Sequence, residues 1–376
     1  MTTGAGPPGP GAASGPAGGG GPAGATVGER AGGATYAGAG VDIAAGDATV
    51  ERLREAVAST VRPEVIGGIG GFGGLFALDT GRFERPVLVS STDGVGTKLL
   101  IARATGRYGT VGIDLVAMCV DDLVCTGAEP LFLLDYVSVG RLVPDRVAEV
   151  VAGIAEGCRQ AGCALLGGET AEHPGAMADD DLDLAGFAVG VVEGRDRLGP
   201  ERVRPGDVLV GLPSPGLRSN GYTLARHVLL HRAGLALSGP AWPGSAHSLA
   251  DELLVPSVIY APAVLAATRQ VPGGVHACAH VTGGGIAGNL VRVLPPSCDA
   301  GIRRGSWEVP RIFTEIARHG AVAADEMDRV FNLGLGMVLA VDPAAADGVL
   351  GVLGSCGHDP VVVGGVTEGT GRVVLR

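Results

Sequence analysis

The stretch Pro86–Lys98 (PVLVSSTDGVGTK), followed by Ile113–Val139 (IDLVAMCVDDLVCTGAEPLFLLDYVSV), decides the fold class. Its apolar positions predict a strand over 86–91, a glycine turn, a helix over 113–125 and a buried strand over 131–139. Strands and helices alternate in the same way along the rest of the chain. The sequence therefore predicts an α/β or α+β protein rather than an all-helical one.

The same patterns predict the elements outside this stretch. Helices are expected at 47–59, 145–161, 223–231, 288–294, 309–318 and 347–353, and strands at 184–192, 207–212, 275–281 and 337–341. The charged segment 194–205, broken by Pro and Gly, is predicted to separate an N-terminal domain (36–203) from a C-terminal domain (204–376). Residues 1–35 include 26 Gly, Ala or Pro, so they are predicted to form a disordered tail.

Length, charge and cysteine usage narrow the class of protein. The 376 residues suffice for two domains, and 28 Lys and Arg against 39 Asp and Glu give a net charge of −11. Because there is no block of basic residues, nucleic acid is not an expected partner. Because there is no apolar run of about 18 residues, neither is a membrane. Seven Cys without a CxxC pair, and an N-terminus without the features of a secretory signal, predict a cytoplasmic protein with reduced thiols.

The glycine turn Asp93–Lys98 is a candidate phosphate site. Gly94 and Gly96 allow backbone N–H groups to approach an anion, and Lys98 adds a positive charge. The spacing of a Walker A loop is absent, and an ordinary turn is the alternative interpretation.

The helix expected after this turn carries three aspartates, Asp114, Asp121 and Asp122. Asp121 falls within about 20° of Asp114 around the helix axis, and Asp122 lies about 80° further round. On a helix otherwise made of apolar residues, such carboxylates repel one another unless a cation neutralises them. Oxygen ligands favour Mg²⁺, and Mg²⁺ favours nucleotide phosphates, whereas ordinary surface acids are the alternative.

Two further segments place polar residues at the end of a strand or before a helix. Gly167–Gly175 (GGETAEHPG) is expected to end a strand in a polar turn. Glu169 in this turn is a candidate for metal binding or proton handling, and a capped loop is the alternative. Ser219 and Asn220 precede a predicted helix, which they either cap or use to hold an anion.

A second possible anion site lies in the C-terminal half. His280–Gly285 (HVTGGG) runs from a predicted strand into a predicted helix, as anion-binding loops do. His276, Cys278 and His280 alternate along the strand and therefore share a face, which raises the question of zinc. No fourth ligand accompanies them in the sequence, and histidines satisfied by hydrogen bonds are the favoured interpretation.

Taken together, the motifs resemble those of one family. They are YAGAGVDIAAGDA, RPEVIGGIGGFGGLF, STDGVGTKL, GIDLVAMCVDDLVCTGAEPLFLLDYV, IAEGC, GGETAEHPG, SNGYTLAR, AHVTGGGI and FNLGLGM, from about Tyr36 to near the C-terminus. In this series the chain resembles the phosphoribosylformylglycinamidine cyclo-ligases, also called aminoimidazole ribonucleotide synthetases. The resemblance implies conversion of ATP and formylglycinamidine ribonucleotide to aminoimidazole ribonucleotide, ADP and phosphate in purine biosynthesis.

The resemblance also implies roles for individual residues. The residues expected at the ATP phosphates are Lys98, Asp93, Gly94, Gly96 and Thr97, with Asp114 and Glu169. The implied Mg²⁺ ligands are Asp93, Asp114, Asp122 and Glu169. Candidates for binding the ribonucleotide substrate are Ser219, Asn220, Thr282, Gly283 and Gly284. His280 is the implied proton-transfer group.

A two-domain ATP-dependent synthetase fold follows from the same resemblance. It implies a homodimer in which the N-terminal sheets of two subunits close into a barrel, and a C-terminal mixed α/β domain. Two positions depart from the family pattern, Asp121 in place of Asn and Arg218 in place of His. The first adds negative charge to the expected metal site, and the second replaces a titratable group with a fixed cation.

Enzymes of the same superfamily are the alternative. Selenophosphate synthetase and thiamine-monophosphate kinase also transfer phosphoryl groups from ATP. The former needs a reactive Cys or selenocysteine near its start, whereas the first Cys here is Cys119.

Overall fold

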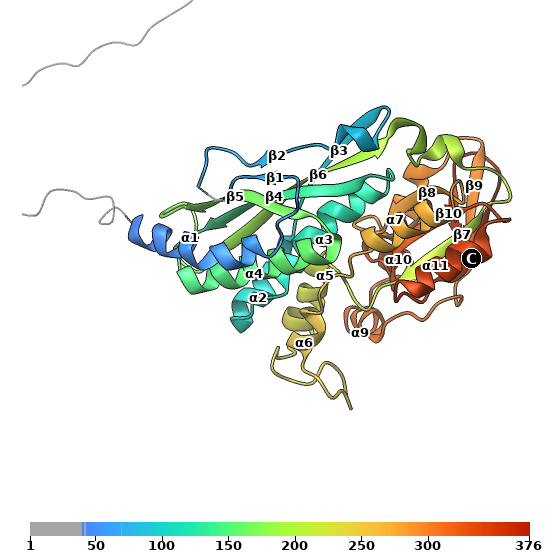
Figure 1. The fold of residues 1–376 in the computed structure, drawn as a ribbon. Coiled ribbons are helices and arrows are strands. Elements are labelled where there is room, and N and C mark those ends of the chain that lie inside the picture. The colour runs from blue at the N-terminus through green and yellow to red at the C-terminus, as the bar shows by residue number, and fades with distance from the viewer. Residues whose placement is uncertain (1–39, 41–42, 69) are drawn as a thin grey trace, which may run out of the picture.

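The computed structural model describes residue 40 and residues 43–68 and 70–376. The tail predicted for 1–35 lies outside the described residues. The chain builds two sheets, one from each half, which lie side by side and are joined through the segment 194–207 (Figure 1). This arrangement confirms the predicted mixed α/β, two-domain architecture.

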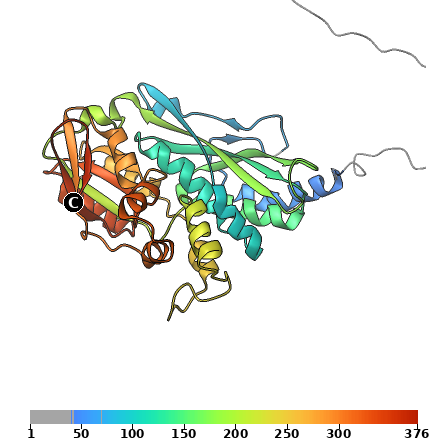
Figure 2. The ribbon, with the colours of Figure 1, turned by 180° about the vertical axis from the view of Figure 1, so that it is seen from behind.

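The N-terminal half forms a four-stranded sheet with helices on one side (Figure 1, Figure 2). Its strand order is β3-β6-β4-β5, with β4 and β5 parallel and the other pairs antiparallel. The elements are α1 (Ile43–Ala58), β1 (Val65–Ile66), β2 (Leu75–Phe76), β3 (Pro86–Gly94), α2 (Leu99–Thr105), α3 (Val111–Val124), β4 (Glu129–Val139), α4 (Pro144–Ala161), β5 (Ala164–Glu172) and β6 (Leu182–Glu193). The short strands β1 and β2 pair only with each other.

The C-terminal half forms a six-stranded sheet of order β12-β9-β11-β7-β10-β8, in which only β12 and β9 are parallel. The elements are β7 (Val208–Pro213), α5 (Tyr222–Arg226), α6 (Leu249–Leu253), α7 (Ala261–Gln270), β8 (Val275–His280), α8 (Gly285–Leu290), β9 (Cys298–Ile302), α9 (Arg311–Gly320), α10 (Ala324–Val330), β10 (Leu335–Val341), α11 (Ala346–Ser355), β11 (Val361–Glu368) and β12 (Val373–Leu375).

Helix α3 is the centre of the molecule. Twelve of its 14 residues are buried, and it packs against β3, β6 and α4 of its own half and against α7 and β8 of the other. The crossing with α4 is close because Gly112 and Gly153 meet there. A Cβ on Gly112 would lie 2.2 Å from the backbone nitrogen of Ile154. Polar side chains on α3 are therefore held between the two sheets rather than on an outer surface.

The structure differs from the sequence prediction at several element ends. Strand β5 was expected to end before Gly167, but it continues to Glu172, because residues 167–172 of the polar segment pair with β4. The predicted helix 223–231 is the short helix α5 followed by a π-helical turn, His227–Arg232. Helix α1 begins at Ile43, so Asp47 lies inside the helix rather than at its cap. No helix of the described residues is long and apolar enough to cross a membrane.

Candidate active site

Three loops from different parts of the chain meet between the two sheets. The turn after β3 is linked to the start of α5 by a 3.1 Å contact between the hydroxyls of Thr97 and Thr223. The loop before α5 meets the glycine loop after β8, because a Cβ on Gly283 would lie 3.5 Å from Oδ1 of Asn220. A cavity of about 570 Å³ is lined by Gly96, Thr97 and the loop 219–224. The fold thus brings the predicted ATP turn beside the predicted substrate loops.

A second cavity, of about 360 Å³, lies near His280. Its wall includes Ser91, Asp122, His280, Asn289 and Arg292, together with apolar side chains and the thiols of Cys125 and Cys278. Asn289 stabilises the glycine loop beside it, since its amide donates to the carbonyl of Gly285 at 2.8 Å. Sequence reasoning missed Asn289 and Arg292, because both lie within a helical segment with no motif of their own.

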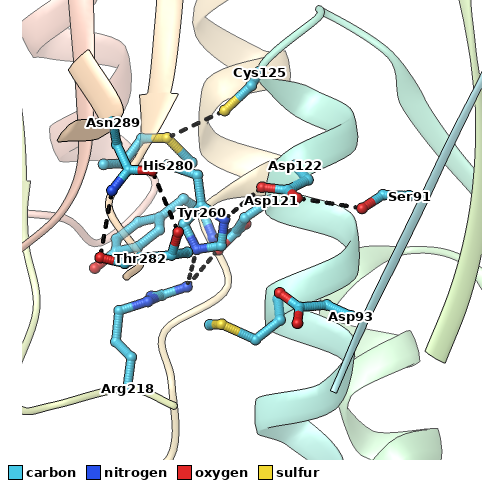
Figure 3. A network of polar contacts seen from close by, with 12 residues as sticks. Ser91, Asp93, Asp121, Asp122, Cys125, Arg218, Tyr260, His280, Thr282 and Asn289 are labelled. Carbon is cyan, nitrogen blue, oxygen red and sulfur yellow. Dashed lines mark hydrogen bonds and ion pairs between the residues drawn. The ribbon is translucent and has the colours of Figure 1, made fainter. Parts of the chain in front are cut away.

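Asp122 on α3 and Asp93 near the end of β3 are two partly exposed carboxylates in the same region (Figure 3). Asp122 Oδ1 lies 2.9 Å from Nδ1 of His280, and Oδ2 accepts a 3.3 Å hydrogen bond from Ser91. Burial on its own would raise the pKa of Asp122, but the hydrogen bonds from His280 and Ser91 outweigh it, so this pKa is lowered. Desolvation raises the pKa of Asp93, and the charge of Asp122 acts in the same direction.

Asp121, the first departure from the family pattern, points away from this pair. Its side chain has no exposed surface, and its Oδ2 lies 2.9 Å from Nη2 of Arg218, the second departure. The backbone N–H groups of Tyr260 and Ala261 donate to its Oδ1 at 2.8 and 3.0 Å. The expectation that Asp121 adds charge to the metal site is therefore wrong, because its charge is neutralised by Arg218.

Lys98 and Asp114 form a second buried ion pair. Lys98 Nζ lies 2.6 Å from Asp114 Oδ2, and neither side chain is exposed. The ammonium also donates to the carbonyl oxygens of Val255 and Arg218, at 2.7 and 3.2 Å. Burial lowers the pKa of Lys98, and the ion pair with Asp114 opposes this shift. In this structure the charge of Lys98, which was expected at the ATP phosphates, is directed to Asp114.

Asp114 and Glu169 do not share a site with Asp93 and Asp122. Asp114 Oδ1 accepts from both the backbone N–H and the hydroxyl of Ser257, in addition to the pair with Lys98. Glu169 lies on β5, three strands from β3, which at about 4.8 Å per strand is roughly 14 Å. It also faces the opposite side of the sheet from Asp93. The four carboxylates implied as Mg²⁺ ligands therefore do not come together within one chain.

Asp135 is a buried carboxylate that sequence reasoning missed. It lies in the middle of β4, 9% exposed, and its carboxyl occupies the space where a Cβ of Gly168 would stand. Burial raises the pKa of Asp135 to about 7. The only signal in the sequence is a single acid inside the apolar run LFLLDYVSV.

The described residues include no group of three or more His, Cys, Asp or Glu side chains arranged to hold a metal ion. His276 is hydrogen-bonded to Asp207 at 2.8 Å, and His280 to Asp122. Both histidines of β8 thus have carboxylate partners, as the favoured interpretation expected. Mg²⁺ usually keeps several waters and needs only one or two carboxylates beside substrate phosphates. Asp93 and Asp122, both partly exposed, fit that requirement.

The two halves of the chain match two known domain families. Residues 79–192 match the model of the AIR synthase related protein, N-terminal domain, and residues 204–376 match that of the C-terminal domain. The chain is therefore a two-domain member of the AIR synthase related family.

Curated relatives identify the enzyme group within this family to which the chain belongs. A phosphoribosylformylglycinamidine cyclo-ligase of Myxococcus xanthus is 55% identical over 333 residues, which cover 89% of this chain and 96% of the relative. One of Trichlorobacter lovleyi is 51% identical over 327 residues, covering 87% and 93%. The chain belongs to the phosphoribosylformylglycinamidine cyclo-ligases, which confirms the resemblance seen in its motifs.

Solved structures share the fold at much lower identity. Thiamine-monophosphate kinase from Stenotrophomonas maltophilia has a TM-score of 0.62 and 19% identity, covering 87% of this chain and 95% of its own. The hydrogenase maturation protein HypE of E. coli has a TM-score of 0.61 and 22% identity, covering 88% and 93%. At these identities the likeness concerns the fold alone.

Proposed function

We propose that this chain catalyses the ATP-dependent ring closure of formylglycinamidine ribonucleotide to aminoimidazole ribonucleotide, with release of ADP and phosphate, in purine biosynthesis. The observation that carries this proposal is the identity of about half of the residues to named cyclo-ligases over nearly nine tenths of the chain. A thiamine-monophosphate kinase or selenophosphate synthetase activity is not favoured, since the kinase shares only 19% of its residues.

The reaction requires the protein to position its substrates and to stabilise phosphate charge, and it requires no nucleophilic side chain. An amide oxygen leaves poorly, so ATP phosphorylates it; the amidine nitrogen then attacks the activated carbon and phosphate departs as the ring closes. Catalysis of phosphoryl transfer relies mainly on positioning and electrostatic stabilisation. In this proposal the backbone of Gly94–Thr97 and the glycine loop 282–284 bind phosphate groups, together with Ser219 and Asn220; the cavity lined by Gly96, Thr97 and the loop 219–224 supports it.

ATP and Mg²⁺ are the cofactors of this proposal. A structural neighbour, a HypE, was solved in complex with ATP, at 18% identity and a TM-score of 0.61. Asp93 and Asp122 would hold the Mg²⁺, which when bound offsets the charge of the phosphates. Ser91 and His280 keep Asp122 in place through its two oxygens. Lys98, fully buried, supports the turn from below instead of contacting the nucleotide.

The experiment is an assay of the purified chain with ATP and either formylglycinamidine ribonucleotide or thiamine monophosphate. We expect ADP to be released with the first substrate only, and aminoimidazole ribonucleotide to form in equal amount. ADP release with thiamine monophosphate alone would refute the proposed function.

We further propose that the protein is a cytoplasmic homodimer that closes through the outer face of the N-terminal sheet. The helices cover one face, and the other exposes Leu88, Tyr136 and Phe187, at 62%, 36% and 47% (Figure 1). Large apolar side chains exposed on one sheet face are typical of an interface between subunits. Sedimentation should give a dimer, and Leu88→Glu should give monomers, whereas Val309→Glu, which changes an exposed residue of the C-terminal half, should not.

A further inference from the structure

A chain of four polar side chains connects the buried interior to the proposed metal site (Figure 3). Asp121 pairs with Arg218, Arg218 contacts His280, and His280 contacts Asp122. The three joining distances are each 2.9 Å. Arg218 is 2% exposed and lies across the ring of Tyr260, with its guanidinium carbon 4.9 Å from the ring centre. Its backbone takes the left-handed conformation, with φ at 62°. The arginine is thus held by several independent contacts.

The direction of each hydrogen bond follows from a count of protons. Arginine carries only donors, so Nε2 of His280 must accept from Nη2 of Arg218. Nε2 therefore carries no proton. The proton of the ring lies on Nδ1, which donates it in a hydrogen bond to Oδ1 of Asp122. Nη2 of Arg218 has two protons, one for His280 and one for Asp121. Nη1 donates to the carbonyl of Val258 at 2.7 Å, which completes the orientation of the guanidinium.

We propose that His280 and Arg218 are positioning residues for Asp122, and that His280 does not transfer a proton in the reaction. Both ring nitrogens are used within the protein, one by a donor that cannot be deprotonated. The imidazole side chain is only 2% exposed, whereas that of Asp122 is 41% exposed. The proton on Nδ1 holds Oδ1 of Asp122 while the hydroxyl of Ser91 donates to Oδ2, so the carboxylate is kept in one orientation. The role of His280 and Arg218 in positioning a metal ligand rests on the proposed Mg²⁺ site. The position of the proton on Nδ1 of His280 does not depend on that site.

The proton position can be measured without metal, nucleotide or activity. In ¹⁵N NMR spectra of metal-free protein labelled in its histidine rings, we expect the His280 ring to show a protonated Nδ1 and an unprotonated Nε2. The resonance is assigned by its loss in His280→Asn. A proton on Nε2 would overturn the proposal, because Nε2 could then not accept from Nη2 of Arg218.

Two isosteric variants separate positioning from proton transfer. The amide nitrogen of an Asn side chain can take the place of Nδ1 and donate to Asp122, whereas that of Gln corresponds to Nε2. Binding of Mn²⁺ with a non-hydrolysable ATP analogue is measured by calorimetry beside turnover. We expect His280→Gln and His280→Ala to weaken this binding about 10- to 100-fold, the range found when partners of metal ligands are removed. His280→Asn should recover most of the loss in both measurements.

Each other outcome counts against a specific part of the proposal. If His280→Asn is as inactive as His280→Ala while Mn²⁺–nucleotide binding is unchanged in both, His280 acts on a proton and the proposal is wrong. If Asp122→Asn leaves Mn²⁺–nucleotide binding unchanged while the NMR result holds, the metal site itself is misassigned, and His280 has no ligand to position.

Discussion

The aspartates of α3 fall into two groups with opposite surroundings. Asp114 and Asp121 have no exposed surface, and each is neutralised by a buried cation, Lys98 and Arg218 respectively. Asp122 is 41% exposed at its side chain, and among the described residues no Lys or Arg forms an ion pair with it. Carboxylates that already pair with a cation of the protein stabilise the fold, and carboxylates without such a cation can attract an ion. One helix thus carries a structural face and a functional face.

The structural face ties the two halves of the molecule together. Asp114 accepts from Ser257, and Asp121 accepts from Tyr260 and Ala261, all in the segment leading into α7. Breaking a buried ion pair costs more than the pair contributes, since an unpaired charge stays behind.

The largest expected effect is on the pair Lys98 and Asp114. Lys98→Met leaves a buried, unpaired carboxylate, so the free energy of unfolding should fall by about 3–5 kcal/mol. Adding Asp114→Asn should recover much of the loss, because the amide oxygen still accepts from Ser257 and carries no charge. Denaturant titration of the three variants measures this. A stable but inactive Lys98→Met would instead place Lys98 in the chemistry.

Asp135 is a buried carboxylate without a paired cation, so its contribution to the free energy of unfolding should depend on pH. The pKa of Asp135 is about 7 in the folded protein, above its unfolded value, so it stabilises the fold when protonated. Its contribution is complete below pH 4 and is lost as the pH rises to about 7, by up to about 4 kcal/mol. Asp135→Asn should therefore be more stable than wild type at pH 8 but not at pH 4. Exposed Asp179→Asn is the control and should be neutral at both.

On the functional face, stability and activity should separate. Asp122→Asn keeps an acceptor for His280 but loses the charge, so turnover should fall about 100-fold, equivalent to about 2.7 kcal/mol. The half-saturating Mg²⁺ concentration should rise. Without Mg²⁺ the variant should melt no lower than wild type, because repulsion from Asp93 is reduced. A lower melting temperature with an unchanged Mg²⁺ requirement would make Asp122 structural.

The smallest effect is the coupling between the two departures from the family pattern. Asp121→Asn restores the usual residue, yet it leaves Arg218 buried without its counter-ion, so it should destabilise. Arg218→His should do the same. The double variant should be more stable than the sum of the two single losses, by about 1–3 kcal/mol. Additive losses in a double-mutant cycle would show that the two positions are independent.

The sequence predicted three aspartates on one helix but not their partners. The helical spacing places Asp122 about 80° from Asp114, yet the resemblance implied both as Mg²⁺ ligands. The neutralising groups could not be found from helical spacing, because Lys98 precedes the helix and Arg218 is 97 residues from Asp121. Likewise, the polar composition of Gly167–Gly175 suggested a turn, but residues 167–172 pair with β4 and form a strand. Local propensity was overridden there by tertiary hydrogen bonding.

The sequence by itself determined the alternation of strands and helices, the glycine loops and membership of the cyclo-ligase family, since these depend on local periodicity and ordered motifs. Only the tertiary structure decided which aspartates pair with a lysine or an arginine of the protein. Whether a carboxylate binds an ion or a lysine depends on what packs against it, and packing brings together residues that are far apart in the chain. For this reason Asp93 and Asp122 remain open, while Lys98, Asp114, Asp121 and Arg218 are enclosed.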